Sequence, residues 1–204
     1  MACQAFADNK QAVPHILIVG DSISAGYGLR PGESWTNLLQ TRLDNDQYSY
    51  KVINASLSGD TTGGGSKRIQ QSLKKHQPAI VIIELGGNDG LRGFSLKKVQ
   101  SNLARMIDLS QQENSRVLLV GIQLPPNYGR SYTKRFSRIY QTLATEKKTA
   151  LVPFLLQGIA DKPQYFQADQ IHPNAAAQIY LLNNVWPVLK KMLKPQISRL
   201  SVGE

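Results

Sequence analysis

Five short apolar runs, rich in β-branched residues, alternate along this 204-residue chain with segments whose apolar residues recur three or four positions apart. Short, continuously apolar runs are typical of strands that are covered on both faces, as in parallel sheets. The segments between them have the period of amphipathic helices. The alternation predicts a three-layer α/β/α protein, doubly wound and flavodoxin-like, with a five-stranded parallel sheet. The predicted strands cover residues 15–20, 50–55, 79–85, 116–122 and 149–154.

Four helical stripes supply the apolar residues that we expect to cover this sheet. Core packing explains such stripes without a cofactor, and we expect none. The stripes are Trp35, Leu38, Leu39 and Leu43; Leu96, Val99, Leu103 and Ile107; Tyr132, Phe136, Ile139, Tyr140 and Leu143; and Ile179, Leu182, Val185, Trp186, Leu189 and Leu193.

Length and composition indicate one globular domain. With 41% hydrophobic and 19% charged residues, the chain has the composition of a folded protein rather than a disordered one. We assign the domain to residues 15–193, between tails at residues 1–14 and 194–204. No apolar run approaches the roughly 18 residues of a membrane-spanning helix. The single cysteine, Cys3, excludes an internal disulfide and a cysteine-based metal site.

Charge and the first residues bear on where the protein works. A net charge of +10 predicts attraction to anions such as phospholipid head groups, nucleic acid or phosphorylated coenzyme A esters. Because the basic residues form no long run, solubility alone is an equal explanation. Ala5-Phe6-Ala7 has the small-x-small pattern that precedes a signal-peptidase cut, although no apolar segment comes before it. We interpret it as the remnant of an export signal.

The first predicted strand ends in Gly20-Asp21-Ser22, where a tight turn would present the serine hydroxyl. Ligands of open α/β sheets bind beyond the carboxyl ends of the strands, so Ser22 is placed where a nucleophile is needed. Taken by itself, the tripeptide is explained better by a plain turn. Gly-x-Ser-x-Gly is absent, because Ser24 stands where the second glycine would be.

A glycine-rich stretch, residues 54–67, follows the second strand and leads into a helix. Backbone N–H groups at a helix start bind anions, which suggests a phosphate loop. The spacing does not fit, because Gly65 stands where that motif requires lysine, so a nucleotide site is a minor alternative. Gly59 can still direct its N–H into the crevice, since a residue without Cβ allows close approach.

The third strand is followed by Gly86-Gly87-Asn88-Asp89-Gly90, which suits a flexible turn. Asn88 also offers an amide donor of the kind that oxyanion holes use. We expect the loop at residues 89–93 to close over substrate, because its glycines permit the change of backbone angles.

Asp169 and His172 occupy the last of these loops. Their Asp-x-x-His spacing lets the carboxylate fold back onto the imidazole, fixing the tautomer that leaves the other nitrogen free as a base. A metal site is a weaker alternative, because His15 and His76 fall away from this edge of the sheet.

The order of these four segments, around Ser22, Gly59, Asn88 and His172, resembles the order of the sequence blocks of the GDSL, or SGNH, hydrolases. The likeness covers about residues 15–193. The likeness extends to a branch of bacterial periplasmic acyl-CoA thioesterases, lysophospholipases and arylesterases. Four longer strings carry it: Asn54-Ala55-Ser56-Leu57-Ser58-Gly59-Asp60-Thr61, Leu85-Gly86-Gly87-Asn88-Asp89-Gly90-Leu91-Arg92-Gly93, Leu124-Pro125-Pro126-Asn127-Tyr128-Gly129 and Ile171-His172-Pro173-Asn174. The run Gly63-Gly64-Gly65 departs from the pattern expected of the branch, which leaves open how mobile that wall is and which acyl chain the enzyme prefers.

The resemblance implies that Ser22 is the nucleophile, His172 the general base and Asp169 its orienting acid. It implies an oxyanion hole made by the Ser22 N–H, the Gly59 N–H and the Asn88 amide. For the acyl site we expect contacts from Asp89, Gly90, Leu91, Leu124, Pro125 and Ile171.

The same resemblance implies a monomeric, periplasmic or secreted enzyme. Its partners would be small acyl esters and thioesters, with no metal, no nucleic acid and at most peripheral contact with a membrane. A carbohydrate or aryl esterase using the same residues is the rival among enzymes. A basic module that binds nucleotides or nucleic acid is the rival outside enzymes.

Overall fold

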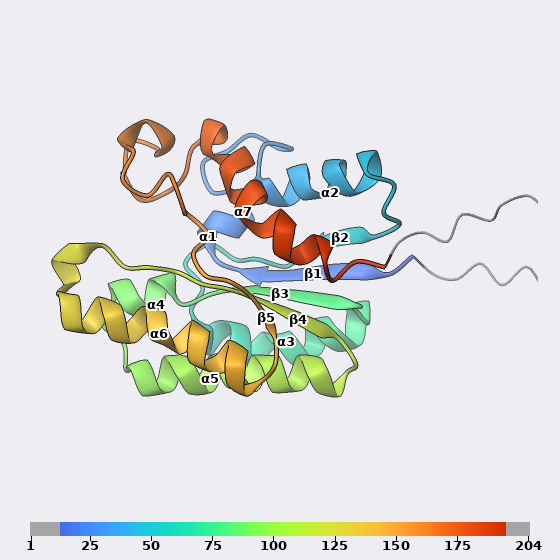
Figure 1. Cartoon of the computed structure of the whole chain (residues 1–204), viewed down its shortest axis with the longest axis horizontal. Coiled ribbons are helices and arrows are strands. Elements are labelled where there is room, and N and C mark those ends of the chain that lie inside the picture. Colours follow the sequence, from blue (N-terminus) through green and yellow to red (C-terminus); the bar gives the residue numbers. More distant parts are fainter. Residues whose placement is uncertain (1–12, 195–204) are drawn as a thin grey trace, which may run out of the picture.

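The computed structural model describes residues 13–194, which form a parallel sheet between two layers of helices (Figure 1). The predicted fold class is confirmed, and every predicted strand is present, shorter by at most two residues at either end. The strands are β1 (His15–Gly20), β2 (Lys51–Asn54), β3 (Ile80–Glu84), β4 (Arg116–Val120) and β5 (Ala150–Val152). They pair in parallel in the order β2-β1-β3-β4-β5. Cys3 and the Ala5-Phe6-Ala7 pattern lie outside the described residues.

Seven α-helices and three short 3-10 segments lie between and after these strands within residues 13–194. The helices are α1 (Ser22–Ala25), α2 (Trp35–Asn45), α3 (Thr62–His76), α4 (Gly87–Leu91), α5 (Leu96–Gln112), α6 (Arg130–Glu146) and α7 (Gln178–Lys190). The 3-10 segments are η1 (Pro126–Tyr128), η2 (Pro163–Tyr165) and η3 (Ala175–Ala177). None of the helices in this part of the chain is both long and apolar enough to cross a membrane.

The sheet separates two hydrophobic cores, one on each face. Successive side chains of a strand point to opposite faces, so β3 sends Ile80 and Ile82 toward α2 and α7, and Val81 and Ile83 toward α3, α5 and α6. All residues of β3 are buried. This explains why the strands are apolar throughout rather than alternating.

The predicted helical stripes face these cores, with one exception. Ile179 lies near the start of α7 on the side turned away from the sheet and is 41% exposed, so its assignment to the core was wrong. Leu193 is buried although it lies beyond the end of α7.

Two predicted loops are helical. Gly63, Gly64 and Gly65 form the first turn of α3, and Gly65 packs so closely that an added Cβ would lie 2.3 Å from the Leu85 side chain. Gly65 thus allows α3 to pack closely against Leu85. Most of the predicted turn after β3 is α4, whose Asp89 is buried.

Candidate active site

Ser22 begins the one-turn helix α1 directly beyond β1. The Asp21 side chain caps this helix, because its Oδ1 accepts the Ile23 N–H at 3.1 Å. Gly26 ends the helix in the left-handed region with φ of +77°, where glycine avoids strain. The half-buried Ser22 therefore sits at the start of a rigid turn at the carboxyl edge of the sheet.

His172 reaches Ser22 from a loop 150 residues further along the chain. Its Nε2 lies 2.9 Å from the Ser22 Oγ, and its Nδ1 lies 2.7 Å from the Asp169 Oδ2. The other oxygen of Asp169 accepts the backbone N–H groups of Ile171 and His172 at 2.9 and 3.0 Å. A hydroxyl, an imidazole and a carboxylate thus form one hydrogen-bonded chain, and the contact between Asp169 and His172 is the one that their spacing predicts.

Hydrogen bonds to Asp169 fix its charge. The backbone N–H of His172, then its ring and then the Ile171 N–H, lower the pKa of Asp169 from 3.8 to about 2. The carboxylate is therefore ionised at neutral pH and accepts a proton-bearing Nδ1. The Nε2 lone pair is then left facing the Ser22 hydroxyl, which is the arrangement that a general base requires.

The three predicted N–H donors come from the start of α1, the turn after β2 and α4. The Asn88 Nδ2 donates to the Asp60 carbonyl at 2.9 Å and, at a longer 3.3 Å, to the Asp21 carboxylate. Gly59 occupies a turn with φ of +78°, which favours glycine. Within residues 13–194, the backbone N–H groups of Ser22 and Gly59 donate to no protein acceptor. These two groups are free to bind a substrate oxygen.

An ion pair anchors the turn that contains Gly59. The Arg68 Nε lies 2.8 Å from the Asp60 Oδ2, and the guanidinium also donates to the Ala55 carbonyl at 2.5 Å. Arg68 belongs to α3, so the turn after β2 is fixed to a long helix. The Gly59 N–H therefore has a defined position before substrate binds.

Two buried carboxyl groups, those of Asp21 and Glu84, contact residues of α1. Glu84, the last residue of β3, has no exposed surface and accepts the Ser24 hydroxyl at 2.6 Å. Burial raises the pKa of Glu84 well above its ordinary 4.5, and the Asp21 charge adds to the effect. Burial also raises the pKa of Asp21 from 3.8 to about 6. Sequence reasoning missed Glu84, because only tertiary folding places it under α1.

Three of the predicted acyl-site residues are buried. The Asp89 carboxylate accepts the Thr62 N–H at 2.8 Å and the Thr62 hydroxyl at 2.7 Å, which ties α4 to the start of α3. Gly90 is covered by Leu124, whose side chain would meet an added Cβ at 2.5 Å. Leu124 itself is only 8% exposed. Asp89, Gly90 and Leu124 therefore have a packing role. Their burial does not support the prediction that they contact substrate.

The other three predicted acyl-site residues have accessible surface. Leu91 is half-buried at the end of α4, while Pro125 and Ile171 are exposed. They come from α4, from the segment after β4 and from the loop that contains His172, all beyond the carboxyl ends of strands.

Two residues that the sequence did not indicate hold the histidine loop in place. The Tyr27 ring lies against the His172 ring, with centroids 4.6 Å apart. Gln167 donates from its side chain to the Tyr27 carbonyl at 2.7 Å and from its backbone to the His172 carbonyl at 2.8 Å. No spacing rule identifies them, because both act through contacts across distant loops.

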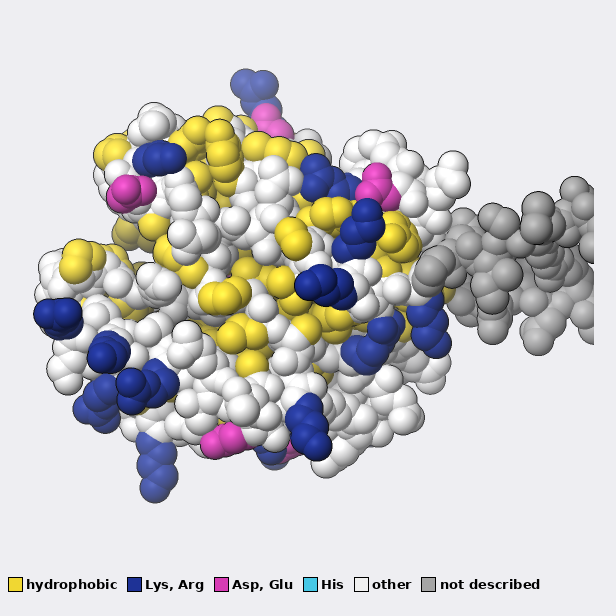
Figure 2. Space-filling model, in the orientation of Figure 1, with side chains coloured by type: hydrophobic (Ala, Val, Ile, Leu, Met, Phe, Trp, Pro, Cys, Tyr) yellow, Lys and Arg dark blue, Asp and Glu magenta, His cyan; other side chains and the backbone are white. Residues whose placement is uncertain are grey.

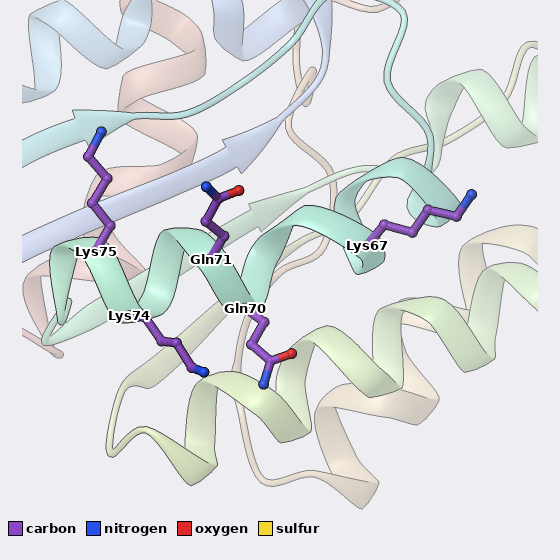
Figure 3. A pocket seen from close by; sticks show the side chains of 5 residues that line it. All are labelled: Lys67, Gln70, Gln71, Lys74 and Lys75. Carbon is purple, nitrogen blue, oxygen red and sulfur yellow. The ribbon is translucent and has the colours of Figure 1, made fainter.

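Other candidate sites lack a comparable arrangement. His15 lies at the opposite edge of the sheet, where its ring contacts the His76 carbonyl. No three His, Cys, Asp or Glu side chains come together as metal ligands in the described part of the chain. A hollow on the outer side of α3 is lined by side chains of that helix alone, which provide ammonium and amide groups but no nucleophile (Figure 3). They are Lys67, Gln70, Gln71, Lys74 and Lys75.

A Ser–His–Asp chain with free N–H donors, at the carboxyl edge of a doubly wound sheet, has the architecture of a serine hydrolase site. Residues 18–178 match the GDSL-like Lipase/Acylhydrolase family, and the chain belongs to that family.

Relatives and solved structures agree with this assignment. The chain is 53% identical to Esterase TesA of Pseudomonas aeruginosa over 89% of its own length and 90% of the relative's. It is 42% identical to Thioesterase 1/protease 1/lysophospholipase L1 of Escherichia coli, over 92% and 86%. A crystal structure of TesA superposes with a TM-score of 0.86 at 53% identity, over 88% of this chain and 99% of that one.

Proposed function

We propose that this enzyme hydrolyses carboxylic esters and thioesters through a covalent acyl-enzyme on Ser22. One observation carries the proposal: the His172 imidazole lies within hydrogen-bond distance of both the Ser22 hydroxyl, at 2.9 Å, and the Asp169 carboxylate, at 2.7 Å. A serine hydroxyl is a weak nucleophile until a positioned base removes its proton.

In the first step, the Ser22 Oγ attacks the carbonyl carbon while its proton moves to the His172 Nε2. The carbonyl oxygen becomes an oxyanion, which the N–H groups of Ser22 and Gly59 and the Asn88 amide would stabilise. The tetrahedral intermediate collapses when its bond to the leaving group breaks, and His172 returns the proton to the departing alcohol or thiol. Water then attacks the acyl-enzyme by the same route and releases the acid.

The names of relatives define the substrate classes to test. They include an esterase, an arylesterase and a thioesterase with lysophospholipase activity. We assign the acyl chain to a crevice bordered by Leu91, Pro125 and Ile171, because these predicted contacts have accessible surface next to the site. Such walls suit an apolar acyl group, which supports a role in lipid metabolism.

A substrate panel tests this proposal. Turnover of palmitoyl-CoA, lysophosphatidylcholine, phenyl acetate and an acetylated sugar is measured for the wild type and for Ser22→Ala. We expect the wild type to hydrolyse the first three and the variant to hydrolyse none. Preference for the acetylated sugar would favour a carbohydrate esterase instead. Full turnover by Ser22→Ala would contradict the nucleophile assignment.

The proposed enzyme works as a monomer in the periplasm or outside the cell. All proposed catalytic groups come from one chain, so no second copy is needed to complete the site. Export is supported by the Ala5-Phe6-Ala7 pattern. Size-exclusion chromatography with light scattering tests the monomer, and cell fractionation of the full-length gene product tests the compartment.

A further inference from the structure

Most of the chain's net positive charge lies in about one quarter of its length. Residues 96–148 contain ten Lys or Arg against three Asp or Glu, which is +7 of the total +10. This segment includes α5 and α6, which pack on the same face of the sheet. Figure 2 shows dark blue side chains gathered at the lower left, over the start of α6, with few magenta ones among them.

The basic residues nearest the active site are at the starts of these helices. Each helix runs antiparallel to the strands, so α5 and α6 begin at the edge where Ser22 lies (Figure 1). Exposed Lys97 and Lys98 occupy the first turn of α5, and exposed Arg130 is the first residue of α6. Neither first turn contains an acidic residue. Because a helix N-terminus is itself partly positive, cations there oppose helix stability. The fold alone therefore does not explain them.

Exposed aromatic side chains accompany these cations. Phe94 is 45% exposed and precedes Lys97 by three residues, while Tyr128 is 38% exposed and precedes Arg130 by two. The Tyr128 hydroxyl donates to the Leu91 carbonyl at 3.2 Å, which joins the two loops. We call this surface the basic aromatic rim; it consists of Arg92, Phe94, Lys97, Lys98, Tyr128 and Arg130.

We infer that the basic aromatic rim docks the enzyme on an anionic phospholipid bilayer, with the active-site edge facing the lipid. Cations near a surface attract anionic head groups, and exposed aromatic side chains enter the interfacial region. The rim adjoins the site, because its Arg92 directly follows α4, the helix that carries Asn88. The inference rests on the proposed function, since docking there would bring lipid esters to Ser22.

Cosedimentation with vesicles tests the inference without measuring catalysis. Binding is compared between vesicles of phosphatidylcholine alone and vesicles that also contain phosphatidylglycerol. The rim variant is Lys97→Gln/Lys98→Gln/Arg130→Gln. The control variant, Lys74→Gln/Lys75→Gln/Lys191→Gln, loses the same charge at the opposite edge, where α3 and α7 end. Hydrolysis of a soluble p-nitrophenyl ester is measured separately for all three proteins.

We expect the wild type to bind the anionic vesicles and not the neutral ones. The rim variant should bind the anionic vesicles about 100-fold more weakly than the wild type, because each of the three cations removed contributes roughly fivefold. Added salt should also weaken binding of the wild type, because it screens this attraction. The control should bind much more tightly than the rim variant. Phe94→Ser should also weaken binding. All variants should keep wild-type turnover of the soluble ester, and the rim variant should melt no lower than the wild type.

Equal losses in the rim and control variants would overturn the inference, because total charge would then be sufficient. The inference would also be overturned if the wild type did not bind anionic vesicles, including the case in which it binds duplex DNA instead. A wild type that binds anionic vesicles but does not hydrolyse the p-nitrophenyl ester would contradict the proposed function and not the docking surface.

Discussion

Replacing Asp169 by asparagine tests how the imidazole is held ready to accept a proton. The new side chain can keep one oxygen for the backbone N–H groups of Ile171 and His172, which Asp169 now accepts at 2.9 and 3.0 Å. Its amide would face the His172 Nδ1 as a donor. The imidazole proton is then on Nε2. This nitrogen donates a hydrogen bond to the Ser22 hydroxyl and has no lone pair to accept the Ser22 proton.

The expected loss follows from the exposure of this side chain. The same change to a buried aspartate in a serine protease lowers kcat about 10⁴-fold. The Asp169 side chain is 38% exposed, so water can replace part of the lost orientation. We expect kcat to fall by roughly 10² to 10⁴, which corresponds to about 2.7–5.4 kcal/mol of activation free energy.

Steady-state hydrolysis of a p-nitrophenyl ester measures this loss, with the melting temperature recorded for each protein. Asp161→Asn is the matched control, because Asp161 is an exposed aspartate of the preceding loop and forms no ion pair within residues 13–194. It should retain wild-type turnover. If the Asp169 variant kept kcat within tenfold of the wild type, the carboxylate would not be orienting the base.

Three further changes test the support around the site. Asn88→Ala should lower kcat by about 10²–10³, the effect of losing one oxyanion donor, and full activity would remove Asn88 from that role. Glu84→Gln should flatten the pH dependence of stability in urea denaturation. The folded protein binds the Glu84 proton more tightly than the unfolded chain, so wild-type stability falls as pH rises above 4.5, by up to about 1.4 kcal/mol per pH unit until the folded pKa is reached. An unchanged slope would show that burial does not hold this carboxyl neutral. Gly65→Ala should destabilise the fold by about 1–3 kcal/mol through overpacking against Leu85. Gly63→Ala, with its nearest atoms at 3.6 Å, should be harmless, and equal effects would refute the packing argument.

Sequence alone predicted the sheet well, because strands buried on both faces must be apolar throughout. β3 is the clearest case: its residues Ile80 to Glu84 are all buried. The long helices were equally visible from their stripes. Ile179 was assigned wrongly because periodicity does not say where a helix turns its stripe away from the core.

The parts of the site that depend on local spacing were also predictable. Asp169 and His172 lie three residues apart, and their contact follows from that spacing. The glycines around Asn88 suggested a flexible turn, yet the segment is helical because the Asp89 carboxylate bonds to Thr62. That bond joins residues 27 positions apart, and no local pattern reveals it. Glu84 and Tyr27 were missed for the same reason.

Labelling with a fluorophosphonate, followed by mass spectrometry of the peptides, tests the central claim most directly. The reagent phosphonylates a serine whose proton a neighbouring base removes. We predict a single adduct on Ser22 that forms much more slowly in His172→Gln. An adduct on a different residue, or ester hydrolysis that survives complete labelling of Ser22, would contradict the account.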